Sequence, residues 1–274
     1  MPELPEVETV ARELQARLPG RTIVAVDVLW TRTIGYPEPG RFAAELVGAR
    51  IESVGRRAKY VVIHLGEGAR LLAHLRMTGR ITIEPVASPR DPYTRLALRF
   101  ADGDELRFAD TRKFGRWYLV PAGESVPLRS FAALGPEPLE EEFTPELFAE
   151  RVAERRGAVK AALLDQRLVA GLGNIYVDEA LFLARINPRR ALQSLAAAEV
   201  VALHAAIVHV LRRAIGSGGT SFSDYRTTWG RLGGYQEELS VFRKTDAPCP
   251  VCGTPIERDI VAGRGTHYCP RCQT

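Results

Sequence analysis

PAGESVPLRSFAALGPEPLEEE, residues 121–142, divides the chain into two parts with different periodicities. The segment is rich in proline, glycine and glutamate, a composition typical of a linker between domains. Before it, over residues 22–120, apolar and polar residues alternate with the period of β-strands. After it, apolar residues recur with the spacing of helices. We therefore expect an α+β protein with a β-rich domain at 1–120, a linker at 121–142 and a helical domain from 143 onward.

The β-rich part begins with a helix and continues with strands. Over residues 6–18 the apolar residues fall on one helix face, and glutamates lie at its start, where the helix dipole favours negative charge. The clearest strands are TIVAVDVLW (22–30), KYVVIHL (59–65) and RITIE (80–84). RLALRF and ELRFAD flank an Ala-Asp-Gly-Asp turn at 101–104, which predicts a hairpin. Since turn residues recur between such strands, we expect an antiparallel sandwich or barrel.

The helical part starts at Thr144-Pro145, where threonine can act as the N-cap and proline occupies the first turn. Further helical patterns cover 158–168, the residues after GLGN (171–174), and 193–215 up to Gly216. The next segment, GSGGTSFSDYRTTWGRLGGY (216–235), is too polar for a core, and its glycines favour a mobile loop.

All four cysteines lie near the C-terminus, in Cys249-Pro-Val-Cys252 and Cys269-Pro-Arg-Cys272. Four thiolates at this spacing can close a tetrahedral zinc site across two turns. Two disulfides are the alternative, but without a secretory signal a reducing cytosol disfavours them. His267 could compete as a ligand, although four cysteines suffice. We expect one structural Zn²⁺, because four sulfurs leave no open coordination position.

The composition is that of an ordinary globular protein, with 46% hydrophobic and 26% charged residues. No apolar run reaches the roughly 18 residues that span a bilayer, so we expect no membrane association. The N-terminus resembles neither a secretory nor a transit peptide, which favours the cytoplasm. A net charge of +4 permits binding to a polyanion without establishing it. Only four of the 37 basic residues are lysines, a bias that genomic base composition can explain.

Pro2 follows the initiator methionine, whose removal would leave a free secondary amine. An α-amino group has a pKa of about 8, against about 10.4 for lysine, so more of it is unprotonated at neutral pH. Such an amine can attack a sugar carbon and form an imine that draws off electrons during elimination. The alternative is a purely structural proline that starts a helix.

Eight segments together resemble formamidopyrimidine-DNA glycosylase, and the resemblance runs from the first residue to the last. They are MPELPEVETV (1–10), RRAKY (56–60), HLRMTGR (74–80), DTRKFG (110–115), LGPEPL (134–139), KAALLDQRLVAGLGNIYVDEALF (160–182), GGTSFSDY (218–225) and CPVCGTPI…RGTHYCPRC (249–272). This resemblance implies a helix and antiparallel β-sandwich as the catalytic domain at 1–120. It further implies a helix–two-turn–helix DNA-binding domain at 143–240, with a lesion-capping loop at 216–235, and a β-hairpin zinc ribbon at 241–274.

The resemblance also implies catalytic roles. Pro2 would be the Schiff-base nucleophile, Glu3 the proton donor that assists sugar opening, and Lys59 a further proton donor. A positive charge at Lys59 would also help to keep the proline amine neutral. Arg264, five residues before Cys269, would grip a phosphate and take part in the second elimination.

Other residues would bind the DNA. Base flipping leaves a gap in the duplex, and Met77, Arg112 and Phe114 match the three residues that fill it in the family. The remaining positions matched to DNA contacts are Glu6, His74, Arg155, Lys160, Asn174, Thr220, Ser221 and Tyr225. His74 could equally be a structural histidine. Tyr93 stands where the family commonly has a histidine, which puts affinity at that position in doubt but not the chemistry.

We thus expect a monomeric base-excision repair enzyme, with damaged double-stranded DNA as partner and neither a nucleotide nor a redox cofactor. It would remove oxidised purines, 8-oxoguanine and formamidopyrimidines, and cleave the abasic site by β,δ-elimination, in a bacterial cytoplasm and associated with the nucleoid through DNA. The alternatives are an endonuclease VIII-like enzyme for oxidised pyrimidines, a non-catalytic zinc-ribbon DNA-binding protein and an RNA-associated ribbon protein. The PELPEVE start and the intact 216–235 loop argue against the first.

Overall fold

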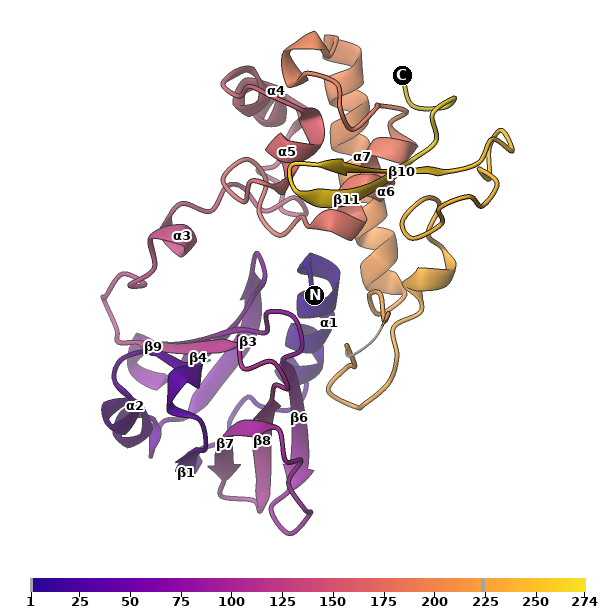
Figure 1. Cartoon of the computed structure of the whole chain (residues 1–274). Helices are drawn as coiled ribbons and strands as arrows, with labels where there is room; N and C mark the ends of the chain where they lie inside the picture. Colours follow the sequence, from indigo (N-terminus) through magenta and orange to yellow (C-terminus); the bar gives the residue numbers. More distant parts are fainter. Residues whose placement is uncertain (1, 223–224) are drawn as a thin grey trace. The chain divides into compact units, whose positions relative to one another are not determined.

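The computed structural model describes residues 2–222 and 225–274, which form two compact units (Figure 1). One unit contains residues up to Ala132 together with Ser217–Gly234, and the other contains Ala133–Gly216 and Tyr235–Thr274. The sequence placed the loop at 216–235 in the helical domain, whereas nearly all of it packs with the β-rich unit. No helix in the described part of the chain is both long and apolar enough to cross a bilayer.

The first unit is an N-terminal helix on a sandwich of two β-sheets. Its helices are α1 (Leu4–Gln15), α2 (Pro39–Leu46) and α3 (Arg129–Ala132), with short 3-10 turns η1 (Thr31–Thr33) and η2 (Gly66–Gly68). Its strands are β1 (Ile23–Val28), β2 (Ile34–Tyr36), β3 (Ile51–Arg57), β4 (Tyr60–Leu65), β5 (Arg70–His74), β6 (Arg80–Pro85), β7 (Thr94–Phe100), β8 (Asp104–Ala109) and β9 (Arg116–Val120). The predicted hairpin at 101–104 is confirmed as the β7–β8 connection.

The two sheets have the strand orders β1-β7-β8-β6 and β2-β9-β5-β4-β3. Phe108 of β8 and Trp117 of β9 meet edge to face between them, with ring centroids 5.6 Å apart. Both rings belong to one apolar core that also takes in the inner face of α1. The antiparallel β-sandwich is therefore confirmed, except that β2 pairs with β9 in parallel.

Helix α1 packs on β3 and β4 through Val7, Val10 and Leu14, all buried. It begins two residues before the predicted start, because Glu3 and Glu6 form a capping box around its first turn. The sequence pattern missed α2, although its start carries an ordinary signal. The Glu38 carboxylate accepts hydrogen bonds from the backbone N–H groups of Gly40 (2.8 Å) and Arg41 (2.5 Å).

The second unit is a group of helices with a C-terminal β-hairpin. It contains α4 (Pro145–Ala153), α5 (Val159–Leu164), α6 (Asn174–Leu183), η3 (Leu192–Ser194), α7 (Ala197–Gly216), η4 (Tyr235–Glu237), β10 (Glu257–Val261) and β11 (Arg264–Tyr268). The predicted N-cap is confirmed, since the Thr144 hydroxyl accepts from the Leu147 N–H at 3.2 Å. Strand β11 packs on α6, which brings the hairpin against the helices within this unit.

Candidate active site

The start of α1 buries three residues that the sequence singled out. Pro2, Glu3 and Glu6 are all buried, with Glu3 and Glu6 only 3% and 1% exposed. The Glu3 backbone N–H donates to Glu6 Oε2 at 2.7 Å, which closes the capping box. Two acidic side chains therefore follow Pro2 within the first turn of α1, in a place shielded from solvent.

Glu6 also holds the loop at 217–234, because its second oxygen, Oε1, accepts from the Thr220 N–H at 2.7 Å. The Tyr225 hydroxyl reaches the Glu6 carbonyl oxygen (3.4 Å) and the Gly218 carbonyl oxygen (3.2 Å). Burial raises the pKa of Tyr225 well above its usual range, so the hydroxyl stays neutral. One carboxylate thus connects the first turn of α1 to the expected lesion-capping loop.

The same loop is fastened further along α1. Glu13 Oε2 accepts from both the backbone N–H and the hydroxyl of Thr228, each at 2.6 Å. The guanidinium of Arg17, just past the helix, stacks 4.2 Å from the centre of the Trp229 ring. Glu6, Glu13 and Arg17 are seven and four residues apart in sequence, the spacing of one helix face, and sequence reasoning missed the last two.

Within the loop, the Ser221 hydroxyl donates to the Tyr225 carbonyl oxygen at 3.1 Å and accepts from the Gly233 N–H at 2.9 Å. Ser221 thereby joins the two ends of the loop. Ser223 and Asp224 belong to the same expected capping segment but lie outside the described residues. The predicted mobility of this loop stays a prediction.

Lys59 lies in the turn between β3 and β4, after Ala58, whose φ of 51° turns the chain sharply. The side chain is largely buried, at 8% exposed. The end of β3 is tied to α1 by Arg56, which donates from Nε to Glu8 Oε2 at 2.8 Å. Although burial would raise it, hydrogen bonds from Arg56 and Arg12 hold the pKa of Glu8 below its usual value. The turn that carries Lys59 is therefore attached to α1, the helix that follows Pro2.

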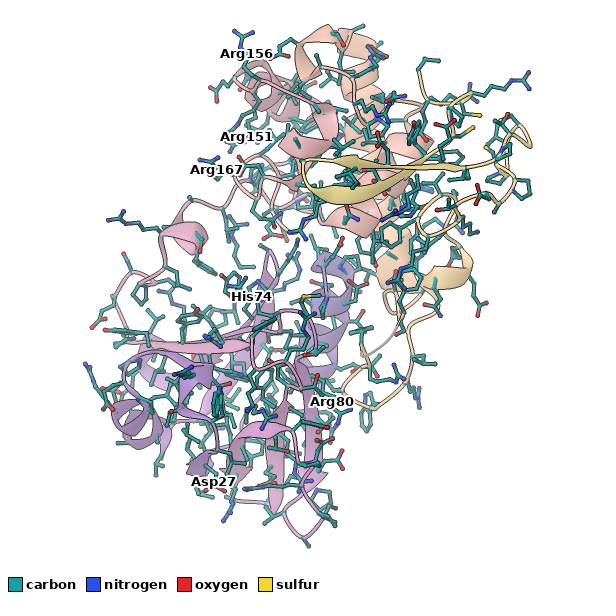
Figure 2. The ribbon with its side chains drawn as sticks, in the orientation of Figure 1. Asp27, His74, Arg80, Arg151, Arg156 and Arg167 are labelled. Carbon is teal, nitrogen blue, oxygen red and sulfur yellow. The ribbon has the colours of Figure 1, made fainter. Side chains whose placement is uncertain are left out.

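His74, at the end of β5, is a buried neutral histidine (Figure 2). Desolvation, helped by the nearby charges of Arg76 and Lys59, lowers its pKa to about 3. Its Nδ1 accepts from the Arg76 N–H at 3.0 Å, so the ring proton sits on Nε2. The ring meets Tyr60 edge to face at 4.6 Å. These contacts favour the structural role that the sequence left open.

Met77, Arg112 and Phe114 come together on the surface of the first unit. Met77 and Phe114 are 41% and 48% exposed, although large apolar side chains are usually buried. Arg112 lies between them, with Nη1 3.1 Å from the Met77 sulfur and its guanidinium 5.0 Å from the centre of the Phe114 ring. Two exposed apolar groups around a guanidinium are what a wedge into stacked bases requires.

Asp110 fixes the loop that carries this cluster. The side chain is 1% exposed. Its Oδ1 accepts from the Thr78 hydroxyl and from the Arg112 N–H (3.1 Å), and its Oδ2 accepts from the Gly115 N–H (2.7 Å). Gly115 has to be a glycine, because a Cβ there would lie 2.3 Å from the Phe108 ring. Sequence reasoning missed Asp110, which precedes the matched residues in DTRKFG.

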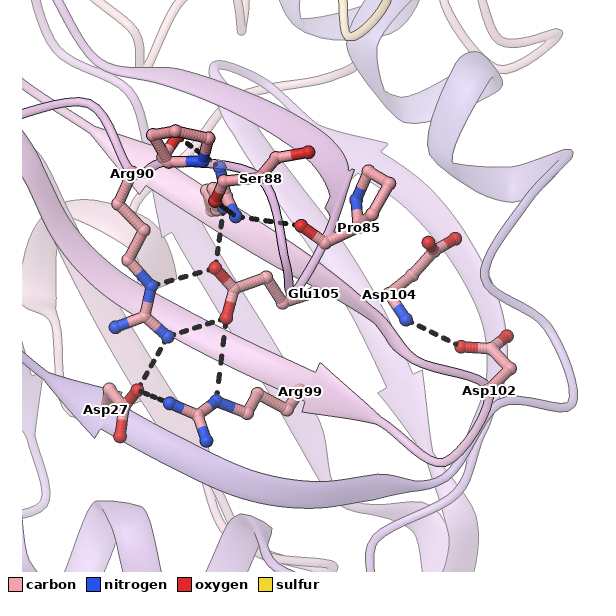
Figure 3. Close-up of polar contacts among 10 residues, drawn as sticks. Asp27, Pro85, Ser88, Arg90, Arg99, Asp102, Asp104 and Glu105 are labelled. Atoms are coloured by element: carbon pink, nitrogen blue, oxygen red, sulfur yellow. Dashed lines mark hydrogen bonds and ion pairs between the residues drawn. The ribbon is translucent and has the colours of Figure 1, made fainter.

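Tyr93 follows a loop that is held by an ion-pair network around a buried carboxylate (Figure 3). Glu105 on β8 is fully buried and accepts from Arg90 (2.6 and 2.8 Å) and from Arg107 (2.6 Å). Burial would raise the pKa of Glu105, but Arg90 and Arg107 hold it below its usual value. Arg107 also donates to three carbonyl oxygens of the loop, those of Pro85, Ser88 and Pro89. The network leaves Tyr93 47% exposed, beside a cavity of about 310 Å³ that Arg80 and Arg226 also line.

In the second unit, Arg151, Arg156 and Arg167 lie along one edge (Figure 2). Arg155 is half-buried and pairs with Asp165 at 3.5 Å. Asn174 is the first residue of α6, and its side-chain amide donates to the Gly265 carbonyl oxygen at 2.8 Å.

Lys160 does not reach the surface, which differs from the expected DNA contact. Its ammonium pairs with Asp178 Oδ1 at 2.6 Å, and both side chains are fully buried. A lysine without exposed surface cannot contact a phosphate in this conformation. A neighbouring acid, Glu179, accepts from the backbone N–H groups of Ser240, Val241 and Phe242 at 2.8–3.0 Å. Asp178 and Glu179 were missed, although two acids inside the apolar run of α6 were a signal of buried charge.

The four cysteines lie close together, with all their Sγ atoms within 4.8 Å of one another. The Cys249–Cys272 and Cys252–Cys269 sulfur pairs are 3.9 and 3.5 Å apart. A disulfide requires about 2.05 Å, whereas tetrahedral zinc with Zn–S bonds of about 2.3 Å places its sulfurs about 3.8 Å apart. His267 instead turns its Nδ1 toward Asp178, 3.3 Å away. The donor set fits one Zn²⁺, and the predicted structural zinc site is confirmed.

A helix-led β-sandwich and a helical unit that ends in a four-cysteine ribbon define a class of zinc-containing DNA glycosylases. Residues 1–117 match the model of the formamidopyrimidine-DNA glycosylase N-terminal domain, 134–226 its H2TH domain, and 247–274 the zinc finger found in FPG and IleRS. The chain belongs to the formamidopyrimidine-DNA glycosylase family.

Individual members of the family are similar to this chain in sequence and structure over its whole length. Formamidopyrimidine-DNA glycosylase of Symbiobacterium thermophilum is 53% identical over all of this chain and 89% of its own length. The Geobacillus kaustophilus protein is 44% identical, with both chains fully covered. A mutant Lactococcus lactis FPG in complex with Fapy-dG-containing DNA superposes with a TM-score of 0.93 at 40% identity, with both chains fully covered. The Lactococcus lactis Fpg complex with DNA containing an abasic site has a TM-score of 0.92 at 40% identity over 99% of each chain.

Proposed function

We propose that this protein removes 8-oxoguanine and formamidopyrimidines from duplex DNA and then cleaves the abasic site by β,δ-elimination. The observation that carries the proposal is the buried start of α1, where Pro2 lies beside Glu3 and Glu6. An imino group next to acidic side chains, away from bulk water, suits nucleophilic attack with nearby proton transfer.

The steps follow from the chemistry of a secondary amine. The Pro2 nitrogen forms a bond to C1′, and the bond from C1′ to the damaged base breaks. Glu3 supplies a proton to the ring oxygen as the sugar opens, which leaves an iminium ion between Pro2 and the sugar. Loss of a C2′ proton then expels the 3′ phosphate, and loss of a C4′ proton expels the 5′ phosphate. Lys59, from its turn beside His74, would act as a further proton donor.

Recognition requires the damaged nucleotide to leave the helix. Met77 and Phe114 would replace its stacking contacts, and Arg112 would pair with the orphaned cytosine. The loop that carries Thr220, Ser221 and Tyr225 would cover the extruded base. Glu6, through Thr220, would hold that loop close to the reacting proline.

The remaining contacts go to the DNA backbone. Tyr93, Arg155, Asn174 and Arg264 are candidates to bind phosphates, with Arg264 also assisting the second elimination. The zinc has four sulfur ligands and would take no direct part in the reaction. We expect a monomer that acts in a bacterial cytoplasm, associated with the nucleoid through DNA.

Sodium borohydride trapping on an 8-oxoguanine:cytosine duplex tests the proposal. Borohydride reduces the iminium ion, so we expect a stable protein–DNA adduct that peptide mass mapping places on Pro2. A version with an uncleaved N-terminal tag is the control, because its proline nitrogen is an amide and cannot attack.

Other outcomes identify other functions. Preferential release of thymine glycol over 8-oxoguanine would indicate an enzyme for oxidised pyrimidines. Binding without any trapped adduct would indicate a non-catalytic DNA-binding protein, and full activity of the tagged version would rule out Pro2 as the nucleophile.

A further inference from the structure

The buried Lys160 side chain contacts the backbone of the zinc-ribbon hairpin. Besides pairing with Asp178, its Nζ donates to the Gly265 carbonyl oxygen at 3.1 Å. The same carbonyl oxygen accepts from the Asn174 amide at 2.8 Å. Two side chains from α5 and α6 therefore converge on one peptide oxygen of β11.

Asp178 binds the same strand two residues further on, at His267. Its Oδ2 accepts from the His267 backbone N–H at 2.9 Å, and the His267 ring lies 3.3 Å away. Since Oδ1 of the same carboxylate pairs with Lys160, the ion pair spans the helices and the strand. The strand is fixed at Gly265 and again at His267.

Gly265 directly follows Arg264, whose side chain is exposed. The backbone of Arg264 is paired with Val261 across a tight turn, in which Ala262 and Gly263 have φ angles of 51° and 70°. The Gly265 carbonyl oxygen belongs to the peptide that follows Gly265, so side chains of α5 and α6 hold this peptide one residue beyond Arg264. Any shift of that peptide moves the base of the arginine side chain.

An ammonium group suits this position better than a guanidinium. Lysine offers three donors on one compact charge, whereas arginine presents a wide planar fork. The site requires two acceptors, Asp178 Oδ1 and the Gly265 carbonyl oxygen, to be reached from a single nitrogen. This gives a physical reason for a lysine at 160 in a chain where only four of 37 basic residues are lysines.

We infer that Lys160 is a positioning residue for Arg264, acting through Asp178 and the Gly265 peptide. The inference rests on the proposed function, in which Arg264 grips a phosphate and assists the second elimination. Lys160 itself does not touch the DNA. It fixes the position of the Arg264 guanidinium at the step in which the 5′ phosphate leaves.

The test compares product ratios in single-turnover reactions on an 8-oxoguanine:cytosine duplex. Lys160→Met alone leaves Asp178 buried without its main partner and can impair folding. The informative variant is therefore K160M/D178N, which removes both charges and keeps an acceptor for the His267 N–H. We expect its ratio of δ- to β-elimination product to fall roughly five- to tenfold, the effect of losing about one hydrogen bond. Base release and borohydride trapping should stay within about twofold of wild type, because Pro2 lies in the other unit.

A double-mutant cycle separates positioning from general structural damage. In an Arg264→Gln background, K160M/D178N should change the product ratio no further, because the residue being positioned is already gone. Lys244→Met is the matched control, since Lys244 is the other lysine of residues 133–274 and is not among the proposed site residues. Bound zinc and the unfolding midpoint are measured for every variant.

Two results would overturn the inference. One is a wild-type product ratio in K160M/D178N, and the other is an equal fall of base release, trapping and both eliminations. Absence of a trapped adduct with the wild-type protein would instead show that the proposed function had failed.

Discussion

Replacement of Asp110 by asparagine tests whether this buried carboxylate fixes the position of the exposed cluster of Met77, Arg112 and Phe114. The carboxylate of Asp110 accepts three hydrogen bonds in a buried position, two at Oδ1 and one at Oδ2. Asparagine keeps only one acceptor oxygen. If that oxygen stays with the Arg112 N–H, the new amide faces the Gly115 N–H, donor against donor.

The magnitude follows from these contacts. A hydrogen bond to a charged group contributes about 1.5–3 kcal/mol, and an unsatisfied buried donor adds to the loss. We expect Asp110→Asn to lower the free energy of unfolding by about 2–3 kcal/mol, which lowers the melting temperature by roughly 4–12 °C. If the whole of this free energy is lost from the transition state for base excision, because the cluster is disordered, the rate of excision falls by at most roughly 30- to 150-fold.

Two assays separate the effects. Thermal unfolding gives the stability, and single-turnover excision compares 8-oxoguanine:cytosine duplex with a duplex that already contains an abasic site. The second substrate has no base to expel, so we expect a smaller loss on it. Asp102→Asn is the control, because Asp102 lies at the exposed β7–β8 turn, where it pairs with Arg21 (3.3 Å) and accepts from the Asp104 N–H (3.3 Å), away from the cluster. Wild-type stability and excision in Asp110→Asn would refute the reasoning.

Three further expectations follow from the same structure. Cys252→Ser should reduce bound zinc from one equivalent toward none in a colorimetric zinc assay and lower the unfolding midpoint, whereas an unchanged metal content would contradict a four-cysteine site. The pKa of His74 is lowered to about 3 in the folded chain, whereas a histidine in the unfolded chain has a pKa of about 6.5. Between these values the unfolded chain binds a proton that the folded chain does not, so the free energy of unfolding should fall as the pH drops from about 6.5 toward 3. His74→Asn should flatten that urea-unfolding profile by up to about 1.4 kcal/mol per pH unit, and an unaltered slope would show that His74 is not the group. Glu13→Gln weakens two hydrogen bonds to Thr228, so Trp229 fluorescence should shift to the red and proteolysis of the loop should accelerate, and no change in either would mean that Glu13 does not hold it.

Local sequence signals predicted much of the fold. The alternation around the 101–104 turn and the Thr144-Pro145 cap both gave the observed elements, because their stabilising contacts lie within a few residues. The parallel pairing of β2 with β9 could not be predicted in this way. It joins strands some eighty residues apart, and no local pattern specifies such a partner.

The candidate site divides along similar lines. The residues proposed to act on the DNA, such as Pro2 and Arg112, were selected through motifs. Residues that hold them, such as Glu13 and Asp110, were missed, because an acid that binds a loop looks the same in sequence as a solvated one. Lys160 shows the converse. The motif implied a DNA contact for it, but the structure shows a buried lysine whose partner is a carboxylate.

Buried acids hold several of the segments proposed to meet DNA, and electrostatics explains why they are buried. Glu6 holds the loop at 217–234, Asp110 holds the loop that carries Arg112, and Glu105 holds the loop before Tyr93. Each of these acids is at most 1% exposed. A carboxylate binds backbone N–H or guanidinium groups more strongly than a neutral acceptor does. Placed on the surface, however, the same charge would repel phosphates, whereas burial beside its donors confines its field to the loop it organises. The arrangement therefore lets acids fix the loops that carry residues proposed to contact DNA, such as Arg112, in a chain with a net charge of only +4.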